Sequence, residues 1–141
     1  FGKIRRHYQG NLRGRTFALW GLAFKPGTDD MREAPSRNLL EALWREGCTV
    51  RAYDPAAMDE VRRIYGERPD FQLCDRPMAV LDNADALVIV TEWSLFRSPD
   101  FDAIRQRLKQ ALIFDGRNLY DPDYMREQGF VYYAIGRGEQ A

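Results

Sequence analysis

Three cations in polar loops are the residues of this sequence that could bind an anionic ligand. Lys25 and Arg32 lie in the loop after the first apolar segment, and Arg117 lies in a loop near the C-terminal end. A lysine supplies a point charge with three donors, and an arginine supplies a planar fork that matches a phosphate or a carboxylate. Lys25 and Arg117 in one crevice would form a site for a nucleotide or a sugar phosphate.

Acidic neighbours allow a second interpretation, in which each cation is paired on a solvated loop. The candidate partners are Asp29, Asp30 and Glu33 in the first loop and Asp115 and Asp121 in the second. Spacing alone favours this second interpretation. Gly116 nevertheless permits a close backbone approach, so Arg117 could reach the same crevice as Lys25.

The first loop has no phosphate-binding glycine pattern. A dinucleotide-binding domain would place Gly-x-Gly-x-x-Gly here, so that backbone amides hold a pyrophosphate. This chain instead reads Gly-Leu-Ala-Phe-Lys-Pro-Gly over residues 21–27. We therefore expect side chains, and not backbone amides, to grip the ligand at this loop.

Other polar and aromatic residues at loop positions have both a functional and a structural interpretation. Asp54 stands where dinucleotide folds put the acid that binds ribose, but before Pro55 it is at least as suited to capping the next helix. Trp93 and Phe96 could line a pocket, although aromatics at such places more often pack beneath a loop.

No residue carries a pattern for catalysis or for metal binding. His7 has no acidic or cysteine partner nearby in the sequence and is expected at the surface. Cys48 and Cys74 have no neighbouring base and no metal-ligand spacing, so we expect core-packing thiols and not nucleophiles.

The elements that must position these loops follow an alternation of apolar runs and helical patterns, which is typical of a parallel sheet covered by helices. Strands are expected over residues 16–24, 49–53, 71–74, 86–90, 111–114 and 130–135. Helices are expected over residues 36–46, 56–65, 77–81, 101–109 and 122–128. Residues 1–10 are expected to be the tail of a preceding linker helix, and residues 11–141 to form the domain.

This pattern predicts an α/β fold: a Rossmann-like, doubly wound, parallel six-stranded sheet with helices on both faces and strand order 3-2-1-4-5-6. Residues 16–23 and 86–90 would be the adjacent central strands, because both runs are apolar on two sides. Ligands of such sheets bind beyond the carboxyl ends of the strands, where the strand order reverses. The loops to consider therefore lie at residues 24–32, 54–55, 91–93 and 115–118.

Composition excludes several classes of partner. The 141 residues carry 21 Lys and Arg against 21 Asp and Glu, so the charge pattern of a nucleic-acid-binding protein is missing. The longest apolar stretch, residues 17–24, is too short for a membrane span, which needs roughly 20 residues. Without a secretory leader or paired cysteines, a cytoplasmic location is expected. Because the chain opens at Phe1 and not at Met, we expect it to be a piece of a longer protein.

The sequence motifs carry a specific resemblance. Residues 21–36, Gly-Leu-Ala-Phe-Lys-Pro-Gly-Thr-Asp-Asp-Met-Arg-Glu-Ala-Pro-Ser, resemble the signature of the C-terminal UDP-binding domain of the UDP-glucose 6-dehydrogenases. Tyr-Asp-Pro at 53–55, Thr-Glu-Trp at 91–93 and Phe-Asp-Gly-Arg-Asn at 114–118 follow in the family's order. GDP-mannose and UDP-N-acetylmannosamine dehydrogenases share part of the first motif, but its continuation and the Thr-Glu-Trp are more similar to the UDP-glucose branch. The resemblance extends from about residue 11 to the end.

The resemblance implies a two-step oxidation of the sugar C6 alcohol to a carboxylate with two NAD+. In the family an N-terminal domain binds NAD and carries the nucleophilic cysteine, and neither its Gly-rich loop nor its cysteine motif is present here. The isolated chain is therefore expected to be inactive. The full-length enzyme is expected to be a homo-oligomer, with the N-terminal domain and UDP-glucose or a related UDP-sugar as partners.

The resemblance also assigns roles to individual residues. Phe24, Lys25 and Arg117 match substrate-binding positions, and Arg32 matches an arginine that reaches across the interdomain cleft to NAD. Gly27 departs from the polar residue that bacterial members often have there. The alternatives are a free-standing Rossmann-like nucleotide-binding module and a purely structural dimerisation domain.

Overall fold

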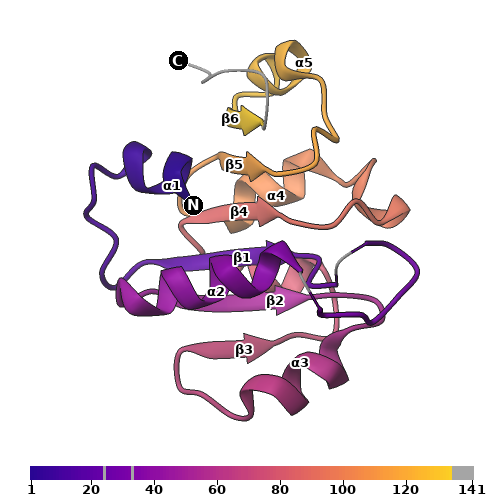
Figure 1. The fold of residues 1–141 in the computed structure, drawn as a ribbon. Helices are drawn as coiled ribbons and strands as arrows, with labels where there is room; N and C mark the ends of the chain where they lie inside the picture. Colours follow the sequence, from indigo (N-terminus) through magenta and orange to yellow (C-terminus); the bar gives the residue numbers. More distant parts are fainter. Residues whose placement is uncertain (24, 33, 135–141) are drawn as a thin grey trace.

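The structure is a computed structural model that describes residues 1–23, 25–32 and 34–134. Its centre is a six-stranded sheet with parallel neighbours in the order β3-β2-β1-β4-β5-β6 (Figure 1). The strands are β1 (Thr16–Trp20), β2 (Thr49–Tyr53), β3 (Phe71–Leu73), β4 (Ala86–Ile89), β5 (Leu112–Asp115) and β6 (Val131–Ala134). The predicted fold class and strand order are confirmed.

Helices connect successive strands. The α-helices are α1 (Gly2–His7), α2 (Pro35–Arg45), α3 (Met58–Tyr65), α4 (Phe101–Arg107) and α5 (Pro122–Glu127). Two short 3₁₀ helices are η1 (Met78–Leu81) and η2 (Ser94–Phe96). The local sequence explains where several helices begin. Both α2 and α5 have a proline in their first turn. The side chain of Asp100 caps α4 and that of Asp121 caps α5, each by accepting a hydrogen bond from a backbone N–H.

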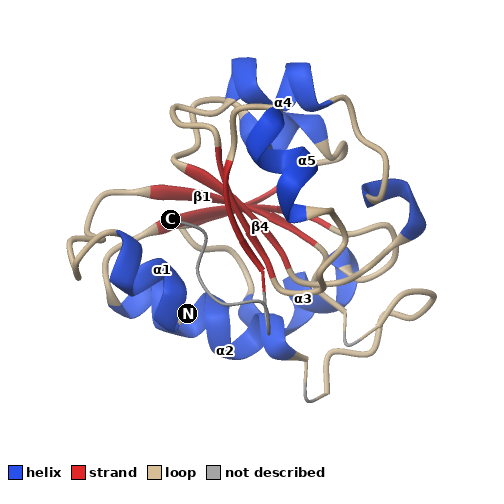
Figure 2. Cartoon of the chain, turned by 90° about the horizontal axis from the view of Figure 1, so that it is seen from above, coloured by secondary structure: helices blue, strands red, loops and turns tan. Residues whose placement is uncertain are grey.

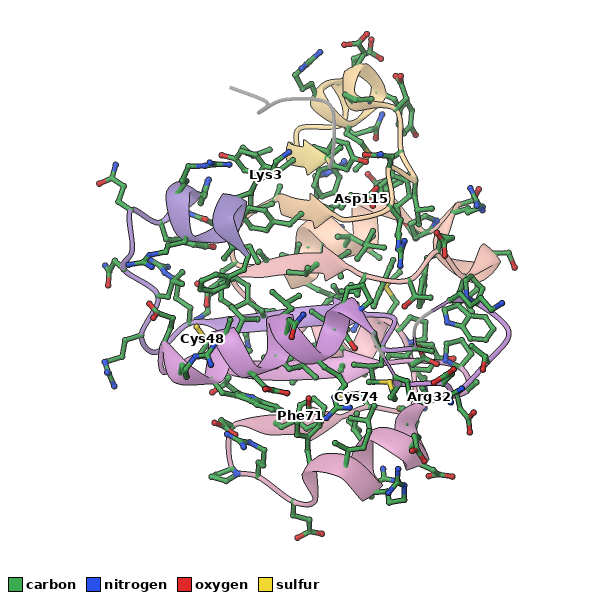
Figure 3. All side chains as sticks on the ribbon, viewed as in Figure 1. Lys3, Arg32, Cys48, Phe71, Cys74 and Asp115 are labelled. Atoms are coloured by element: carbon green, nitrogen blue, oxygen red, sulfur yellow. The ribbon has the colours of Figure 1, made fainter. Side chains whose placement is uncertain are left out.

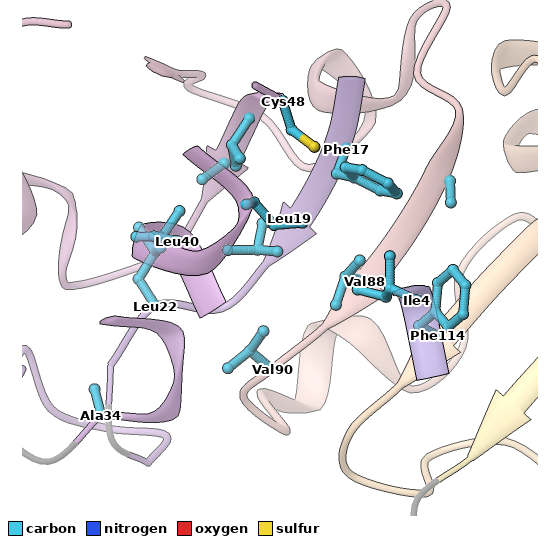
Figure 4. Close-up of a cluster of buried hydrophobic side chains, with 14 of the residues drawn as sticks. Ile4, Phe17, Leu19, Leu22, Ala34, Leu40, Cys48, Val88, Val90 and Phe114 are labelled. Atoms are coloured by element: carbon cyan, nitrogen blue, oxygen red, sulfur yellow. The ribbon is translucent and has the colours of Figure 1, made fainter. Parts of the chain in front are cut away.

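The two faces of the sheet bury separate apolar clusters. In Figure 2, α1, α2 and α3 cover one face, and α4 and α5 cover the other. Phe17, Leu19 and Val88 belong to the first cluster together with Leu40 of α2 (Figure 4). On the opposite face Trp20 is stacked on Phe96 with ring centroids 4.9 Å apart. Burial on both faces is why the central strands read as continuous apolar runs.

The first strand is shorter than the sequence predicted. β1 ends at Trp20, whereas the apolar run extends to residue 24. Gly21 adopts a φ of 93°, which turns the chain out of the strand. Leu22 and Ala23 remain fully buried, so they keep the apolar pattern of a strand without its hydrogen bonds. The register still places Phe17 beside Ala86, so the predicted adjacency of the central strands is confirmed.

Smaller differences from the expected elements also have local causes. Residues 56 and 57 form a turn before α3, because their amides bond to the side chain of Asp54. The helix expected over residues 77–81 is the single turn η1. The last strand was expected to reach Ile135, which lies outside the described residues.

Residues 1–10 contain the short helix α1, which folds back onto β5 and β6. His7 Nδ1 lies 2.7 Å from the Tyr133 hydroxyl, and Lys3 Nζ donates to the Ala134 carbonyl at 2.5 Å. The His7 ring also meets Phe114 edge-on. His7 was expected at the surface, and the structure shows a partly exposed ring that α1 packs against the sheet.

Because neighbouring strands are parallel, the loops that follow β1, β2, β4 and β5 open at one edge of the sheet. The strand order reverses between β1 and β4, and this is where ligands of such folds bind. Within the described residues, no helix is both long enough and apolar enough to span a membrane.

Candidate functional site

A buried carboxylate lies beneath the loop that follows β1. Asp54 is fully buried, and its Oδ2 accepts hydrogen bonds from the amides of Leu22 and Ala23 at 2.7 and 3.1 Å. Its Oδ1 accepts from the amides of Ala56 and Ala57, both at 2.8 Å. This carboxylate therefore holds two backbone segments of its own chain. The sequence allowed Asp54 to cap the next helix, but the N-cap of α3 is Ala57 and it has no side-chain cap bond. Asp54 instead holds the turn that precedes α3.

The first loop does not fit a dinucleotide pyrophosphate. The amides of Leu22 and Ala23, which such a loop would offer to phosphate oxygens, already donate to Asp54. The absence of a side chain at Gly21 instead lets Thr91 pack against its backbone, since a Cβ at residue 21 would lie 2.5 Å from Cβ of Thr91. The expected lack of a phosphate cradle at this loop is thus explained by contacts within the chain. The amides of Leu22 and Ala23 are therefore not available to the pyrophosphate of NAD.

The loop between β1 and α2 presents Lys25 and Arg32 at the surface. The side chain of Arg32 is 89% exposed, and its Nε and Nη2 donate to the carboxylate of Asp30 at 3.1 and 3.0 Å. This hydrogen bond from Arg32 lowers the pKa of Asp30. Arg32 is therefore paired within its loop in the way that the second interpretation of the cations described. Lys25 is exposed, and Phe24 lies outside the described residues.

Arg117 is held more firmly than the other two cations. Its Nε donates to the carbonyl of Val90 at 2.7 Å and lies 3.7 Å from Oε2 of Glu92. The expected partners of its side chain were Asp115 and Asp121, but the carboxylate of the ion pair is that of Glu92. Asp115 is buried and accepts from the backbone amide of Arg117 instead, at 2.8 Å. The guanidinium thus reaches across to the end of β4.

The Asp115 carboxylate stabilises the loop that follows β5. It also accepts hydrogen bonds from the Leu119 amide at 2.7 Å and from the Tyr132 hydroxyl at 2.6 Å. Gly116 donates to the carbonyl of Ile89 at 2.8 Å, and a Cβ at Gly116 would lie 3.0 Å from that oxygen. The close backbone approach expected at Gly116 is confirmed: the backbone after β5 lies against the end of β4 at Ile89.

A cavity of about 440 Å³ lies between the starts of α1 and α2 and the carboxyl ends of β4 and β5. Its lining includes Lys3, Arg6, Pro35, Leu39, Val90 and Arg117. Lys25 does not line it, so the structure places only Arg117 of the described candidates in this cavity. The contributions of α1 were missed by the sequence analysis, since no local pattern ties residues 1–10 to the loop after β5.

The remaining candidates have structural roles. The indole N–H of Trp93 donates to Asp54 at 3.3 Å, and Phe96 is fully buried. Cys48 and Cys74 are free and buried; Cys48 directly precedes β2 and Cys74 directly follows the neighbouring β3 (Figure 3). Burial raises the pKa of Cys48 to about 11 and also raises the pKa of Cys74, which keeps both thiols protonated. In the described part of the chain, no three His, Cys, Asp or Glu side chains are grouped to hold a metal ion.

Comparison with known families identifies this arrangement. Residues 18–122 match the model of the UDP-glucose/GDP-mannose dehydrogenase family, UDP binding domain. The chain belongs to this family. The resemblance carried by the motifs at the ends of the first, second, fourth and fifth strands is thus confirmed.

Curated relatives of this UDP-binding domain include the UDP-glucose 6-dehydrogenase of Pseudomonas aeruginosa, 56% identical over 140 residues, covering 97% of this chain and 31% of that protein. The UDP-glucose 6-dehydrogenase of Rhizobium meliloti is 43% identical over 129 residues, 91% of this chain and 29% of that protein. The UDP-binding domain thus spans about three tenths of the length of these relatives.

Solved structures of longer chains contain the same fold. The NDP-N-acetyl-D-galactosaminuronic acid dehydrogenase of Methanosarcina mazei Go1 matches with a TM-score of 0.77 and 29% identity, over 96% of this chain and 27% of that one. The UDP-glucose dehydrogenase of Pyrobaculum islandicum matches with a TM-score of 0.72 and 30% identity, over 93% of this chain and 27% of that one.

Proposed function

We propose that this chain is the substrate-binding domain of an NAD-dependent UDP-glucose 6-dehydrogenase. The full enzyme would convert UDP-glucose, two NAD+ and water into UDP-glucuronate and two NADH. The observation that carries the proposal is the 56% identity to a UDP-glucose 6-dehydrogenase over 97% of the chain. The family match over residues 18–122 also includes the loops that follow β1, β2, β4 and β5 at the carboxyl edge of the sheet, where a ligand of this fold binds.

In this proposal the chain supplies affinity and orientation, and the chemistry belongs to the N-terminal domain. Arg117 and Lys25 would bind the negatively charged diphosphate, and Phe24 would pack on the nucleotide sugar. Arg117 is supported by its position, since it lines the cavity beyond β4 and β5 with its orientation fixed by Val90. Lys25 is supported by its exposure at the same edge of the sheet.

NAD would be held by the N-terminal domain, because the first loop of this chain has no free backbone amides at Leu22 and Ala23 for a pyrophosphate. Arg32 would contact the cofactor from this side, and its exposed guanidinium is available to a second domain. We also propose that the enzyme is a cytoplasmic homo-oligomer. The free thiols Cys48 and Cys74 agree with a reducing compartment.

A binding and turnover experiment on the full-length protein tests the proposal. UDP-glucose, UDP and GDP-mannose are titrated by calorimetry, and NADH formation is followed with each nucleotide sugar. We expect UDP-glucose to bind and to be oxidised with two NADH per sugar. Binding without oxidation would support a free-standing nucleotide-binding module, and a preference for GDP-mannose would assign the chain to another branch of the family.

A further inference from the structure

Leu22 and Ala23, which precede the Lys25 loop, are hydrogen-bonded through their backbone groups to side chains from three separate parts of the fold. The hydroxyl of Ser36, in the first turn of α2, donates to the carbonyl of Leu22 at 2.5 Å. The hydroxyl of Thr91, which follows β4, donates to the carbonyl of Ala23 at 2.8 Å. With Asp54 on both amides, each polar backbone group of Leu22 and Ala23 has a side-chain partner. We name Ser36, Asp54 and Thr91 the backbone clamp.

The backbone clamp is buried and closely packed. Ser36, Asp54 and Thr91 are each 0% exposed. Close contact of Gly21 with Thr91 leaves no room for a side chain at residue 21. A buried polar network in which every member is satisfied holds a single arrangement, since any displacement leaves an unpaired polar group. The backbone entering the Lys25 loop is therefore fixed at a defined place.

The same clamp is linked to the loop that orients Arg117. The indole of Trp93 donates to Oδ2 of Asp54, the oxygen that also holds Leu22 and Ala23. Glu92, which lies between Thr91 and Trp93, forms the ion pair with Arg117. The segments after β1, β2 and β4 are thus joined through the carboxylate of Asp54. Lys25 lies in the first of these segments, and Arg117 contacts the third through Val90 and Glu92.

We propose that Ser36, Asp54 and Thr91 are positioning residues, which hold the loop carrying Lys25 in register with Arg117 before the substrate arrives. This inference rests on the proposed function. A preorganised site avoids the loss of loop freedom on binding, so affinity depends on the clamp even though the clamp does not touch the ligand. A single residue of the chain separates Ala23 from Lys25. The clamp on Ala23 therefore limits the positions that the Lys25 ammonium can reach.

The test compares two substitutions at residue 91 in the full-length protein. Thr91→Val keeps the shape of the side chain but leaves the carbonyl of Ala23 without a donor, whereas Thr91→Ser keeps the hydroxyl and loses only a methyl group. We expect Thr91→Val to raise the Kd of UDP-glucose about tenfold, and Thr91→Ser to remain within about twofold of the wild type. Amide hydrogen exchange at Leu22 and Ala23 should become faster in Thr91→Val alone.

Ser36→Ala is the second variant, because it removes one hydroxyl and is the mildest change in the clamp. We expect it to weaken UDP-glucose binding in the same direction. Asp85→Asn is the matched control for loss of stability: Asp85 is a buried carboxylate at the opposite end of β1, where it accepts from the amide of Thr16 at 2.8 Å. It should lower the melting temperature without changing the Kd of UDP-glucose.

The outcomes separate the inference from the proposed function. If Thr91→Val and Thr91→Ser bind UDP-glucose equally well, or Asp85→Asn weakens binding as much as Thr91→Val, the clamp only stabilises the fold and the inference is overturned. If the wild-type protein does not bind UDP-glucose, the proposed function itself is wrong and the inference falls with it.

Discussion

Arg117 and Val90 connect two neighbouring strands at the edge where the substrate would bind. The guanidinium Nε of Arg117 donates to the Val90 carbonyl at 2.7 Å, so a cation that leaves β5 is fixed at the end of β4. The remaining guanidinium nitrogens carry further donors, and the side chain is 29% exposed beside the cavity.

Loss of this side chain should weaken substrate binding. We expect Arg117→Ala to raise the Kd of UDP-glucose by roughly one to two orders of magnitude, because a charge-assisted hydrogen bond contributes roughly 1.5 to 3 kcal/mol. Calorimetric titration of the full-length protein measures it. Arg62→Ala is the matched control, since Arg62 pairs with Asp59 on the surface of α3. Equal affinities of wild type and Arg117→Ala would show that Arg117 is only a structural cation.

The thiols of this chain should not support oxidation of the sugar. We expect the isolated chain, mixed with UDP-glucose and NAD+, to form no NADH. Cys48 has a pKa of about 11 because of burial, and its thiol donates to the carbonyl of Leu12 at 3.4 Å. A thiol reagent should therefore modify neither cysteine until denaturant is added. NADH formation that Cys48→Ser or Cys74→Ser abolishes would place the nucleophile in this chain after all.

The sequence predicted what depends on local pattern. Two-sided apolarity marked β1 and β4 as the central strands, and the strand-helix alternation gave the order of the sheet. It did not predict that β1 ends at Trp20, because Leu22 and Ala23 are as apolar as a strand. Gly21 turns the chain with a φ of 93°, and the amides of Leu22 and Ala23 bond to Asp54, 32 and 31 residues away, in place of a neighbouring strand.

The same limit applies to the candidate site. Spacing pointed to acids close to Arg117 in the sequence, yet its ion pair is with Glu92, on the neighbouring strand's loop. Likewise His7 contacts Tyr133, 126 residues away, through the packing of α1. Such contacts follow from tertiary structure, which a single sequence does not contain. The family motifs nevertheless include the residues that make these contacts in the site, since Asp54, Thr91 and Glu92 all lie in the segments that resemble the family.

The single histidine should make stability depend on pH. Burial, with a smaller contribution from the charge of Arg15, lowers the pKa of His7 below its usual 6.5. Below about pH 6.5, His7 is therefore protonated more readily in the unfolded chain than in the folded chain. The free energy of unfolding should fall as the pH decreases toward the pKa of His7 in the folded state. Urea unfolding between pH 7.5 and 5 measures this fall. The His7→Gln variant should show a smaller fall, and identical slopes for the two proteins would contradict the assignment.

Gly21 should not tolerate a side chain. An alanine there would place its Cβ 2.6 Å from the backbone nitrogen of Thr91, in a residue with a φ of 93°. We expect Gly21→Ala to destabilise the chain by roughly 2 to 4 kcal/mol, from the strained backbone and the overpacking together. Gly27→Ala is the control for the backbone term, since Gly27 has a φ of 82° but open space around it. Equal losses in both variants would mean that the contact with Thr91 is readily relieved.

Lys25 and Arg32 lie in one loop but should serve different ligands. In the full-length protein we expect Lys25→Ala to raise the Kd of UDP-glucose by roughly one to two orders of magnitude, through loss of a charge-assisted contact with the diphosphate. Arg32→Ala should leave that Kd unchanged and raise the KM of NAD+, because the guanidinium must leave its exposed pair with Asp30, which contributes little, to reach the cofactor.

The Lys25→Ala/Arg117→Ala double variant then tests whether the two cations share one ligand. Charges that contact the same diphosphate are coupled, so the double variant should lose less binding free energy than the sum of the single losses, by roughly 0.5 to 3 kcal/mol. Strictly additive losses would show that the cations contact separate parts of the ligand. Wild-type affinity in Lys25→Ala would show that Lys25 is a solvated surface charge and that Arg117, inside the cavity, binds the diphosphate without it.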